Sequence, residues 1–179
     1  MAAIIEDNHL RPEEIDRIHA YLEATCVEPI FHNRDITNQV DAQFSVAYNL
    51  SVLSFGIKPG IRWQEWDTMN NPEIRRFMDK VTFEPHPRYV DALKTNPNAR
   101  ISRVEVSARG RTFVEERDFI KGTLTSDRAT YITDDELIAK FKDNASRILP
   151  ARKVDEAWRR LMDLDSVGDV TTVIELLHL

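Results

Sequence analysis

The feature that most constrains the fold is a run of mostly apolar residues over 42–55, which leaves few polar positions. Such a run is typical of a helix buried on most of its sides, because a surface helix keeps one polar face. Gly56 follows directly, and glycine often ends a helix because it adopts the left-handed conformation at little cost. We therefore predict a largely buried helix over 42–55. Its apolar side chains include Phe44, Ala47, Leu50, Val52 and Leu53.

The composition supplies a core for this helix and excludes several classes of protein. A chain of 179 residues, 42% hydrophobic and 30% charged, suits one soluble domain spanning 1–179. The formal net charge of −6 gives no basic face of the kind that binds nucleic acid. The longest apolar run is far too short to span a membrane, and the first residues lack the basic character of a targeting signal. One cysteine, Cys26, cannot form an internal disulfide, so we expect a cytoplasmic protein that binds neither nucleic acid nor membrane.

The segment 15–25 fits two kinds of element. Its apolar residues largely alternate with polar ones, as in a half-buried strand. Three of them, Ile15, Ile18 and Leu22, also share one face of a helix. Periodicity favours the strand without excluding the helix.

Capping and turn residues mark other elements more clearly. Asn71-Pro72 has the form of a helix start, with Asn at the N-cap and Pro at the first helical position. Gly110 supplies the turn of a hairpin between 101–108 and 111–119. Thr133 and Glu136 form a capping box. We also predict a helix end at 2–8, a loop at 29–41, a short helix around Trp63 and Trp66, a strand beginning at 81–83, a loop at 122–131, and helices at 154–162 and 170–177 with Asp169 as a cap.

These strands and helices do not alternate regularly along the chain, which favours an α+β fold. We predict a two-layer domain in which a small, mainly antiparallel sheet packs on helices, followed by C-terminal helices over 150–179.

The residues alone indicate no cofactor or metal. Five glycines in the whole chain include no phosphate-binding loop. The histidines do not have the spacing of metal ligands. We expect His86, between two prolines, to be an exposed loop residue, Arg75-Arg76 to lie on a solvated helix face, and Cys26 to be a buried, inert thiol. The five histidines are His9, His19, His32, His86 and His178.

Six stretches resemble, in order and spacing, motifs of the MmgE/PrpD family, which includes 2-methylcitrate dehydratase, cis-aconitate decarboxylase and iminodisuccinate epimerase. The most informative is Ala42-Gln-Phe-Ser-Val-Ala-Tyr48, which resembles the family signature AQFS-x-x-Y. The others are LRPEEIDRI at 10–18, NPEIRRFMDKV at 71–81, RGR at 109–111, TDDEL with KF at 133–141, and the closing stretch 167–177.

The resemblance implies that the chain is the smaller C-terminal α+β domain of such an enzyme, in which 1–10 is the remnant of a helix and 15–25 is a strand. The active site would lie between this domain and a larger helical domain, which carries most of the polar machinery. The chain would therefore need a helical domain or subunit as its partner, be inactive alone, and form homo- or hetero-oligomers. The implied substrate is a small polycarboxylate, and no metal or organic cofactor is implied.

Within the resemblance, Tyr48 matches the active-site tyrosine, whose phenol would bind a substrate carboxylate or transfer a proton. Gln43 and Ser45 lie close by on the same predicted helix and are candidate substrate-binding residues. The alternative for Tyr48 is a core tyrosine whose hydroxyl is satisfied internally. The chain departs from the family pattern at Arg109, where the hairpin turn usually has Asp, and over the loop 122–132.

Two functions follow. The chain is either part of an enzyme that dehydrates, decarboxylates or epimerises a small polycarboxylate, or a non-catalytic module for assembly or small-acid binding. A neighbouring reading frame that encodes the helical domain would favour the enzyme. The sequence leaves the substrate and the reaction type open.

Overall fold

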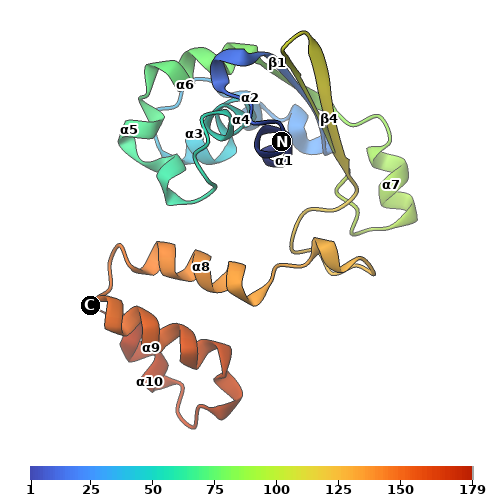
Figure 1. Ribbon diagram of the computed structural model, residues 1–179. Coiled ribbons are helices and arrows are strands. Elements are labelled where there is room, and N and C mark those ends of the chain that lie inside the picture. Colours follow the sequence, from blue (N-terminus) through green and yellow to red (C-terminus); the bar gives the residue numbers. More distant parts are fainter. Residues whose placement is uncertain (179) are drawn as a thin grey trace. The chain divides into compact units, whose positions relative to one another are not determined.

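The computed structural model describes residues 1–178, and its contacts divide the chain into two units, Met1–Thr130 and Tyr131–Leu179. The first unit contains all the strands among the described residues, together with short helices (Figure 1). The described part of the second unit contains helices only. The predicted α+β class is confirmed. None of the helices within residues 1–178 has the length and hydrophobicity that a transmembrane span requires.

Four strands of the described chain form one sheet in the order β2-β1-β3-β4. They are β1 (Ile15–Leu22), β2 (Val81–Pro85), β3 (Ser102–Ala108) and β4 (Arg111–Arg117). β1 pairs antiparallel with β3, and β3 with β4, but β1 pairs parallel with β2. The sheet is therefore mixed, with one parallel pairing beside the predicted hairpin.

A bulge in β1 explains the double pattern of the segment 15–25, whose prediction as a strand is confirmed over Ile15–Leu22. The register with β3 shifts between Ile15 and Arg17, so one extra residue stands on β1. Ile15 and Ile18 are consequently both fully buried although they are three residues apart. Lys80 Nζ donates to the Ile15 carbonyl oxygen at 2.5 Å and so satisfies the backbone at the bulge.

The predicted helix over 42–55 is wrong in one respect, because it is two helices, α3 (Gln39–Phe44) and α4 (Val46–Ser54). Ser45 between them has extended backbone, φ −62° and ψ 112°, and its Oγ accepts from the Tyr48 amide at 3.2 Å. A serine in that position is a preferred N-cap, which favours a new helix start over a continuous helix. Burial is as predicted on one side, since Tyr48 and Val52 are fully buried.

The predicted loop at 29–41 is also partly helical. It contains α2 (Pro29–His32) and the first residues of α3. The Asn38 side chain caps α3. In return the Asp41 carboxylate accepts a hydrogen bond from the Asn38 amide, which completes a capping box. Asp41 stands where such a box usually has Glu or Gln, so the sequence departs from the usual capping-box pattern.

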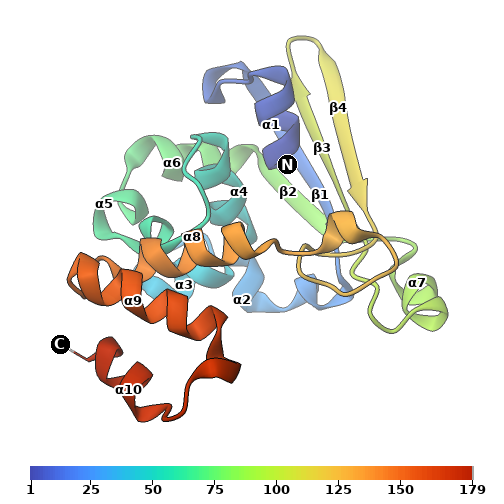
Figure 2. The same ribbon diagram turned by 60° about the horizontal axis from the view of Figure 1, so that its bottom comes forward.

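The remaining helices of the first unit lie mostly on one face of the sheet, where Figure 2 shows α1, α4 and α6. Asn71 caps α6 as predicted, with Oδ1 accepting from the amides of Glu73 and Ile74. The segment of α7 was not predicted as a helix. The bounds are α1 (Ala2–Asn8), α5 (Trp66–Met69), α6 (Pro72–Phe77) and α7 (Tyr89–Thr95), with 3₁₀ turns that include Ala24–Val27 and Ile61–Gln64.

The second unit is built from α8 (Asp134–Ala145), α9 (Ala151–Met162) and α10 (Thr171–Ile174). The predicted capping box of Thr133 and Glu136 is confirmed. Asp169 accepts from the Thr171 amide at 2.9 Å, one residue before the N-cap of α10. The buried side chains of the second unit are Leu149, Val154, Ala157 and Val173.

Cys26, in the turn Ala24–Val27, is buried as predicted. Its burial raises the pKa of the thiol above the ordinary value, and the Glu23 carboxylate adds to the rise.

The β3–β4 turn gives Arg109 a structural role. Arg109 and Gly110 both have positive φ, 53° and 72°, as a tight hairpin requires. The Arg109 guanidinium forms a fork with the Glu14 carboxylate at 3.0 and 2.8 Å. It also donates to the carbonyls of Asn8 and His9. The hairpin tip is thereby joined to the segment between α1 and β1.

The Glu14 carboxylate should contribute to acid sensitivity. Its hydrogen bonds from the Arg109 side chain and the Arg11 amide lower its pKa from 4.5 to about 2. A carboxyl whose pKa is lowered in the folded state stabilises that state at pH values above 4.5, the pKa in the unfolded chain. This contribution is lost as the pH falls toward 2. Glu14→Gln should therefore lower the unfolding free energy at pH 7, and its difference from the parent chain should shrink in acid.

Urea unfolding of both proteins over this pH range measures the difference. Glu13→Gln is the matched control, because it removes the same charge from a carboxylate whose contact is with exposed Arg11, at 3.4 Å. An equal loss in the two variants would contradict a specific role for the Arg109–Glu14 fork.

Candidate functional site

Tyr48, the predicted catalytic residue, lies in the first turn of α4 with its side chain in the core. The residue is 0% exposed, and its hydroxyl donates to the Trp63 carbonyl oxygen at 2.5 Å. Burial raises the pKa of the phenol to about 12, although the positive charge of Arg75 acts in the opposite direction. The phenol therefore stays protonated at neutral pH and serves as a hydrogen-bond donor.

The two predicted substrate-binding residues have different surroundings. Ser45 is fully buried, and its hydroxyl caps α4. Gln43 is exposed near the end of α3. The structure thus places Ser45 beside the backbone of Tyr48 but leaves Gln43 on the surface, and their binding roles remain predictions.

Backbone carbonyls and side-chain donors fix the surroundings of Tyr48. Trp63 Nε1 donates to the Ile57 carbonyl at 2.9 Å, which holds the loop after α4 in place. Arg75 is half-buried and donates to the carbonyls of Met69 and Ile36. The prediction of a solvated face is therefore wrong for Arg75, whose charge binds backbone oxygens, whereas Arg76 is exposed.

The other face of the sheet is polar. Along β1, His19 and Tyr21 alternate with the buried Ile18 and Ala20, so they point away from the core. Cross-strand partners extend this face, because Tyr21 stands opposite Arg103 of β3, which stands opposite Glu116 of β4. The imidazole of His19 contacts the Thr82 hydroxyl at 2.8 Å, and its ring packs edge-on to Tyr21 at 4.6 Å.

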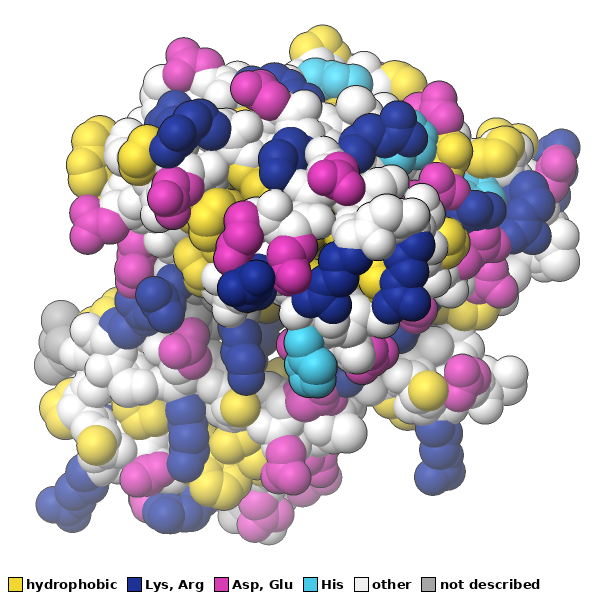
Figure 3. Space-filling view, turned by 45° about the horizontal axis from the view of Figure 1, so that its top comes forward, with side chains coloured by type: hydrophobic (Ala, Val, Ile, Leu, Met, Phe, Trp, Pro, Cys, Tyr) yellow, Lys and Arg dark blue, Asp and Glu magenta, His cyan; other side chains and the backbone are white. Residues whose placement is uncertain are grey.

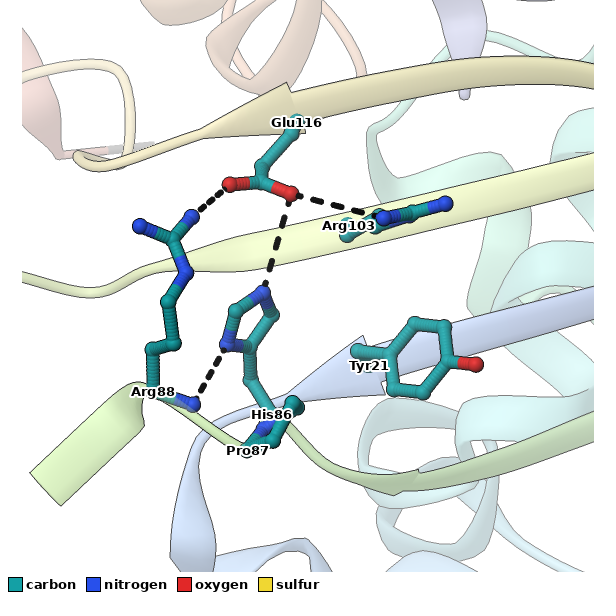
Figure 4. Close-up of a pocket in the computed structure, with 6 residues that line it drawn as sticks. All are labelled: Tyr21, His86, Pro87, Arg88, Arg103 and Glu116. Atoms are coloured by element: carbon teal, nitrogen blue, oxygen red, sulfur yellow. Dashed lines mark hydrogen bonds and ion pairs between the residues drawn. The ribbon is translucent and has the colours of Figure 1, made fainter.

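A cavity of about 300 Å³ opens on this polar face. Figure 4 shows Glu116 on one side of it, with Arg88, His86 and Arg103 turned toward the carboxylate. Arg88 Nη2 binds Glu116 Oε1, while His86 Nε2 and Arg103 Nη1 lie 3.8 and 4.0 Å from Oε2. The cavity is lined by Tyr21, His86, Pro87, Arg88, Arg103 and Glu116.

His86 is buried, with 5% of its surface exposed, so the prediction of an exposed loop residue is wrong. Its amide donates to the Leu22 carbonyl at the end of β1, which draws the ring onto the sheet. Its Nδ1 accepts from the Arg88 amide at 3.1 Å. The neutral ring therefore carries its proton on Nε2, the atom that faces Glu116.

Arg103 has unused hydrogen-bonding capacity. Its Nη2 pairs with Glu105 Oε1 at 2.6 Å, and its guanidinium lies 5.8 Å from the centre of the Tyr21 ring. Its Nε is the one buried side-chain nitrogen or oxygen without a hydrogen-bond partner among the described residues. An unpaired buried donor is unusual in a folded protein.

The sequence reasoning did not find this cavity. Alternation within each strand already places Tyr21, Arg103 and Glu116 away from the apolar positions, but their meeting depends on the register between strands. Among the described residues no group of three or more His, Cys, Asp and Glu is arranged to hold a metal ion.

The family model of the MmgE/PrpD C-terminal domain matches residues 1–164. The chain belongs to the MmgE/PrpD family. The match includes the whole first unit together with α8 and α9 of the second. A comparison with curated proteins gave no match.

The stretch 42–48, which resembles a motif of the family, coincides with the α3–α4 junction. Ser45 of that stretch separates the two helices and orients the first turn of α4. The stretch therefore has a structural function in this chain.

Tyr48→Phe should destabilise the fold, because the Trp63 carbonyl loses its donor in a buried place. The expected loss is about 1–3 kcal/mol, measured by urea unfolding. Tyr89→Phe is the matched control. The Tyr89 hydroxyl donates at 3.2 Å to the carboxylate of Glu23, which is an exposed residue. Water can replace that bond, so a loss as large as that of Tyr48→Phe would argue against the importance of the Trp63 bond.

Proposed function

We propose that this MmgE/PrpD domain forms part of an enzyme that dehydrates, decarboxylates or epimerises a small polycarboxylate by proton transfer next to a carboxylate. The observation that carries the proposal is the family match over residues 1–164. In this proposal a helical domain, in a separate chain or in a further segment of the same protein, supplies the remaining catalytic groups.

The surroundings of Tyr48 support the need for such a partner. The hydroxyl bonds to a backbone carbonyl, and the phenol pKa of about 12 makes it a poor base at neutral pH. We assign Tyr48 the role of a neutral donor that exchanges the Trp63 carbonyl for a substrate carboxylate. Ser45 keeps the backbone of Tyr48 in place, and Gln43 is available on the surface to contact substrate or partner.

We also propose that the two units act together as one family domain. The family match continues from the first unit into α9, so the family pattern does not end at the boundary between the units. The apolar side chains exposed on this chain would then be covered in a homo- or hetero-oligomer. They include Phe44, Ile61 and Trp66 in the first unit and Ile148, Leu161 and Ile174 in the second.

The chain alone should not turn over cis-aconitate or 2-methylcitrate, and adding a helical-domain partner from the same host should produce lyase or epimerase activity. Loss of substrate and appearance of product can be followed by NMR. Activity of the isolated chain would contradict the proposal, as would an inactive complex with a helical domain that binds it.

In the active complex, Tyr48→Phe should lower kcat at least tenfold, which corresponds to about 1.4 kcal/mol in the barrier. Circular dichroism must show that the variant is folded at the assay temperature, since the same change removes a core hydrogen bond. Tyr89→Phe serves as the control in the same assay. An unchanged rate in folded Tyr48→Phe would assign the residue to the core alone.

A second candidate function is a non-catalytic module for small-acid binding or assembly. The satisfied hydroxyl of Tyr48 favours it, because a core tyrosine with an internal partner needs no substrate. An inert complex and an unchanged Tyr48→Phe variant would support this candidate.

A further inference from the structure

The two edges of the sheet differ in how they are closed. β2 forms one edge, where Arg34 Nη2 donates to the Val81 carbonyl at 2.8 Å. The His32 ring stacks on Phe83 of the same strand, with 4.5 Å between the ring centres. β2 ends at Pro85, which has no amide hydrogen to offer. Features of this kind prevent a strand edge from pairing with other chains, so the edge at β2 is protected.

β4 forms the other edge of the sheet, and this edge is open (Figure 2). Ala108 and Arg111 flank the hairpin turn as a hydrogen-bonded pair, so every second residue from Arg111 directs its backbone toward β3. The residues between them direct their amides and carbonyls away from the sheet, and they are Thr112, Val114 and Glu116. None of these backbone groups bonds to another residue of the described chain. β4 can therefore accept a further strand.

The side chains of β4 bring apolar area and unused charge to this edge. Phe113 packs, partly buried, against the core cluster, and Val114 on the other face is 48% exposed. The Arg111 guanidinium lies 4.3 Å from the centre of the Phe113 ring and forms no ion pair within residues 1–178. Both nitrogens that Arg117 directs at Glu115 bind Oε1, which leaves Oε2 free to accept. β4 thus presents a cation and a carboxylate oxygen that a partner can pair.

We propose that β4 pairs antiparallel with β4 of a second copy of this chain, in the register that sets Phe113 opposite Phe113 of that copy. In this register Arg111 stands opposite Glu115 of the second copy, twice by symmetry. Opposite charges that face each other directly stabilise a strand pair. The outward backbone groups of Thr112 exchange both hydrogen bonds with those of Val114. The two Phe113 rings then extend the apolar layer across both copies.

Charge selects this register among the alternatives. Outward backbone groups must meet outward groups, so one strand can slide along the other only in steps of two residues. One step sets Arg111 opposite Arg117 of the second copy, and further steps set Glu115, and then Glu116, opposite the same residue. Like charges in these positions destabilise a strand pair. A step in the other direction runs β4 into the turn at Gly110.

A second copy suits this edge because β4 is complementary to itself. Acidic and basic side chains are interspersed over the face seen in Figure 3, where no extended patch of one sign indicates a highly charged partner. The pairing uses none of the exposed apolar side chains, such as Phe44 and Trp66, that were assigned above to an oligomer. It is therefore independent of the proposed enzyme, and its test measures association alone.

Sedimentation velocity of the full chain over a range of concentrations tests the pairing. The parent chain should change from monomer to dimer as its concentration rises. Val114→Pro should abolish the dimer, because proline removes an outward amide hydrogen and leaves the ladder with β3 intact. Val114→Thr, which keeps the amide and the branched side chain, is the matched control and should still dimerise. A parent chain that stays monomeric, or an undiminished dimer in Val114→Pro, would overturn the proposal.

Charge variants test the register. Arg111→Glu sets two acids opposite each other and Glu115→Arg sets two bases opposite each other, so each variant alone should weaken dimerisation about tenfold. An equimolar mixture of the two restores opposite charges at both positions and should dimerise like the parent chain. Arg76→Glu makes the same change at an exposed arginine of α6 and should have no effect. A mixture that stays monomeric, or an equal effect of Arg76→Glu, would contradict the register.

Folding of each variant is checked by its urea unfolding curve. If Val114→Pro is unfolded, hydrogen exchange of the parent chain decides. The amides of Thr112 and Val114 should exchange more slowly at high protein concentration than at low concentration, whereas those of α4 should not change. Exchange at Thr112 and Val114 that is independent of concentration would overturn the pairing.

Discussion

The first unit depends on one buried cluster that unites the apolar face of β1 with the helix that carries Tyr48. β1 is paired on both sides, so its side chains on the core face can be buried only by a helix layer, and Ile15, Ile18, Tyr48 and Val52 share one cluster there. A phenol in such a cluster needs an internal acceptor, which the Trp63 carbonyl provides. Packing of the sheet therefore also fixes the loop after α4.

Local signals in the sequence predicted the elements whose ends are set by one or two residues. Asn71, Gly110 and Thr133 act where they stand, through capping and turn conformation, so α6, the hairpin and α8 were predicted correctly. The helix break at Ser45 was missed because a serine inside an apolar run is also compatible with a continuous helix. The bulge at Ile15 could not be predicted, because it is defined by the pairing of β1 with β3, which is far away in the sequence.

The two candidate sites differ, for the same reason, in how far they can be predicted from the sequence. Tyr48 was found through the motif around it, which is local, although its bond to Trp63 was not foreseen. The cavity beside Glu116 is lined by the end of β1, the loop after β2 and the two strands of the hairpin, so no single stretch of sequence indicates it. His86 shows the difference most clearly, since flanking prolines indicated a surface loop while a bond to the Leu22 carbonyl draws the ring onto the sheet.

The single buried thiol makes the chain its own reporter of local opening. Cys26 is 3% exposed in the turn that joins β1 to α2, and a raised pKa keeps it mostly as the less reactive thiol. A thiol reagent can therefore modify the folded protein only during transient exposure of that turn. Because there is one cysteine, the labelling rate follows one region without any engineered residue, and it would register whether a bound partner slows its fluctuations.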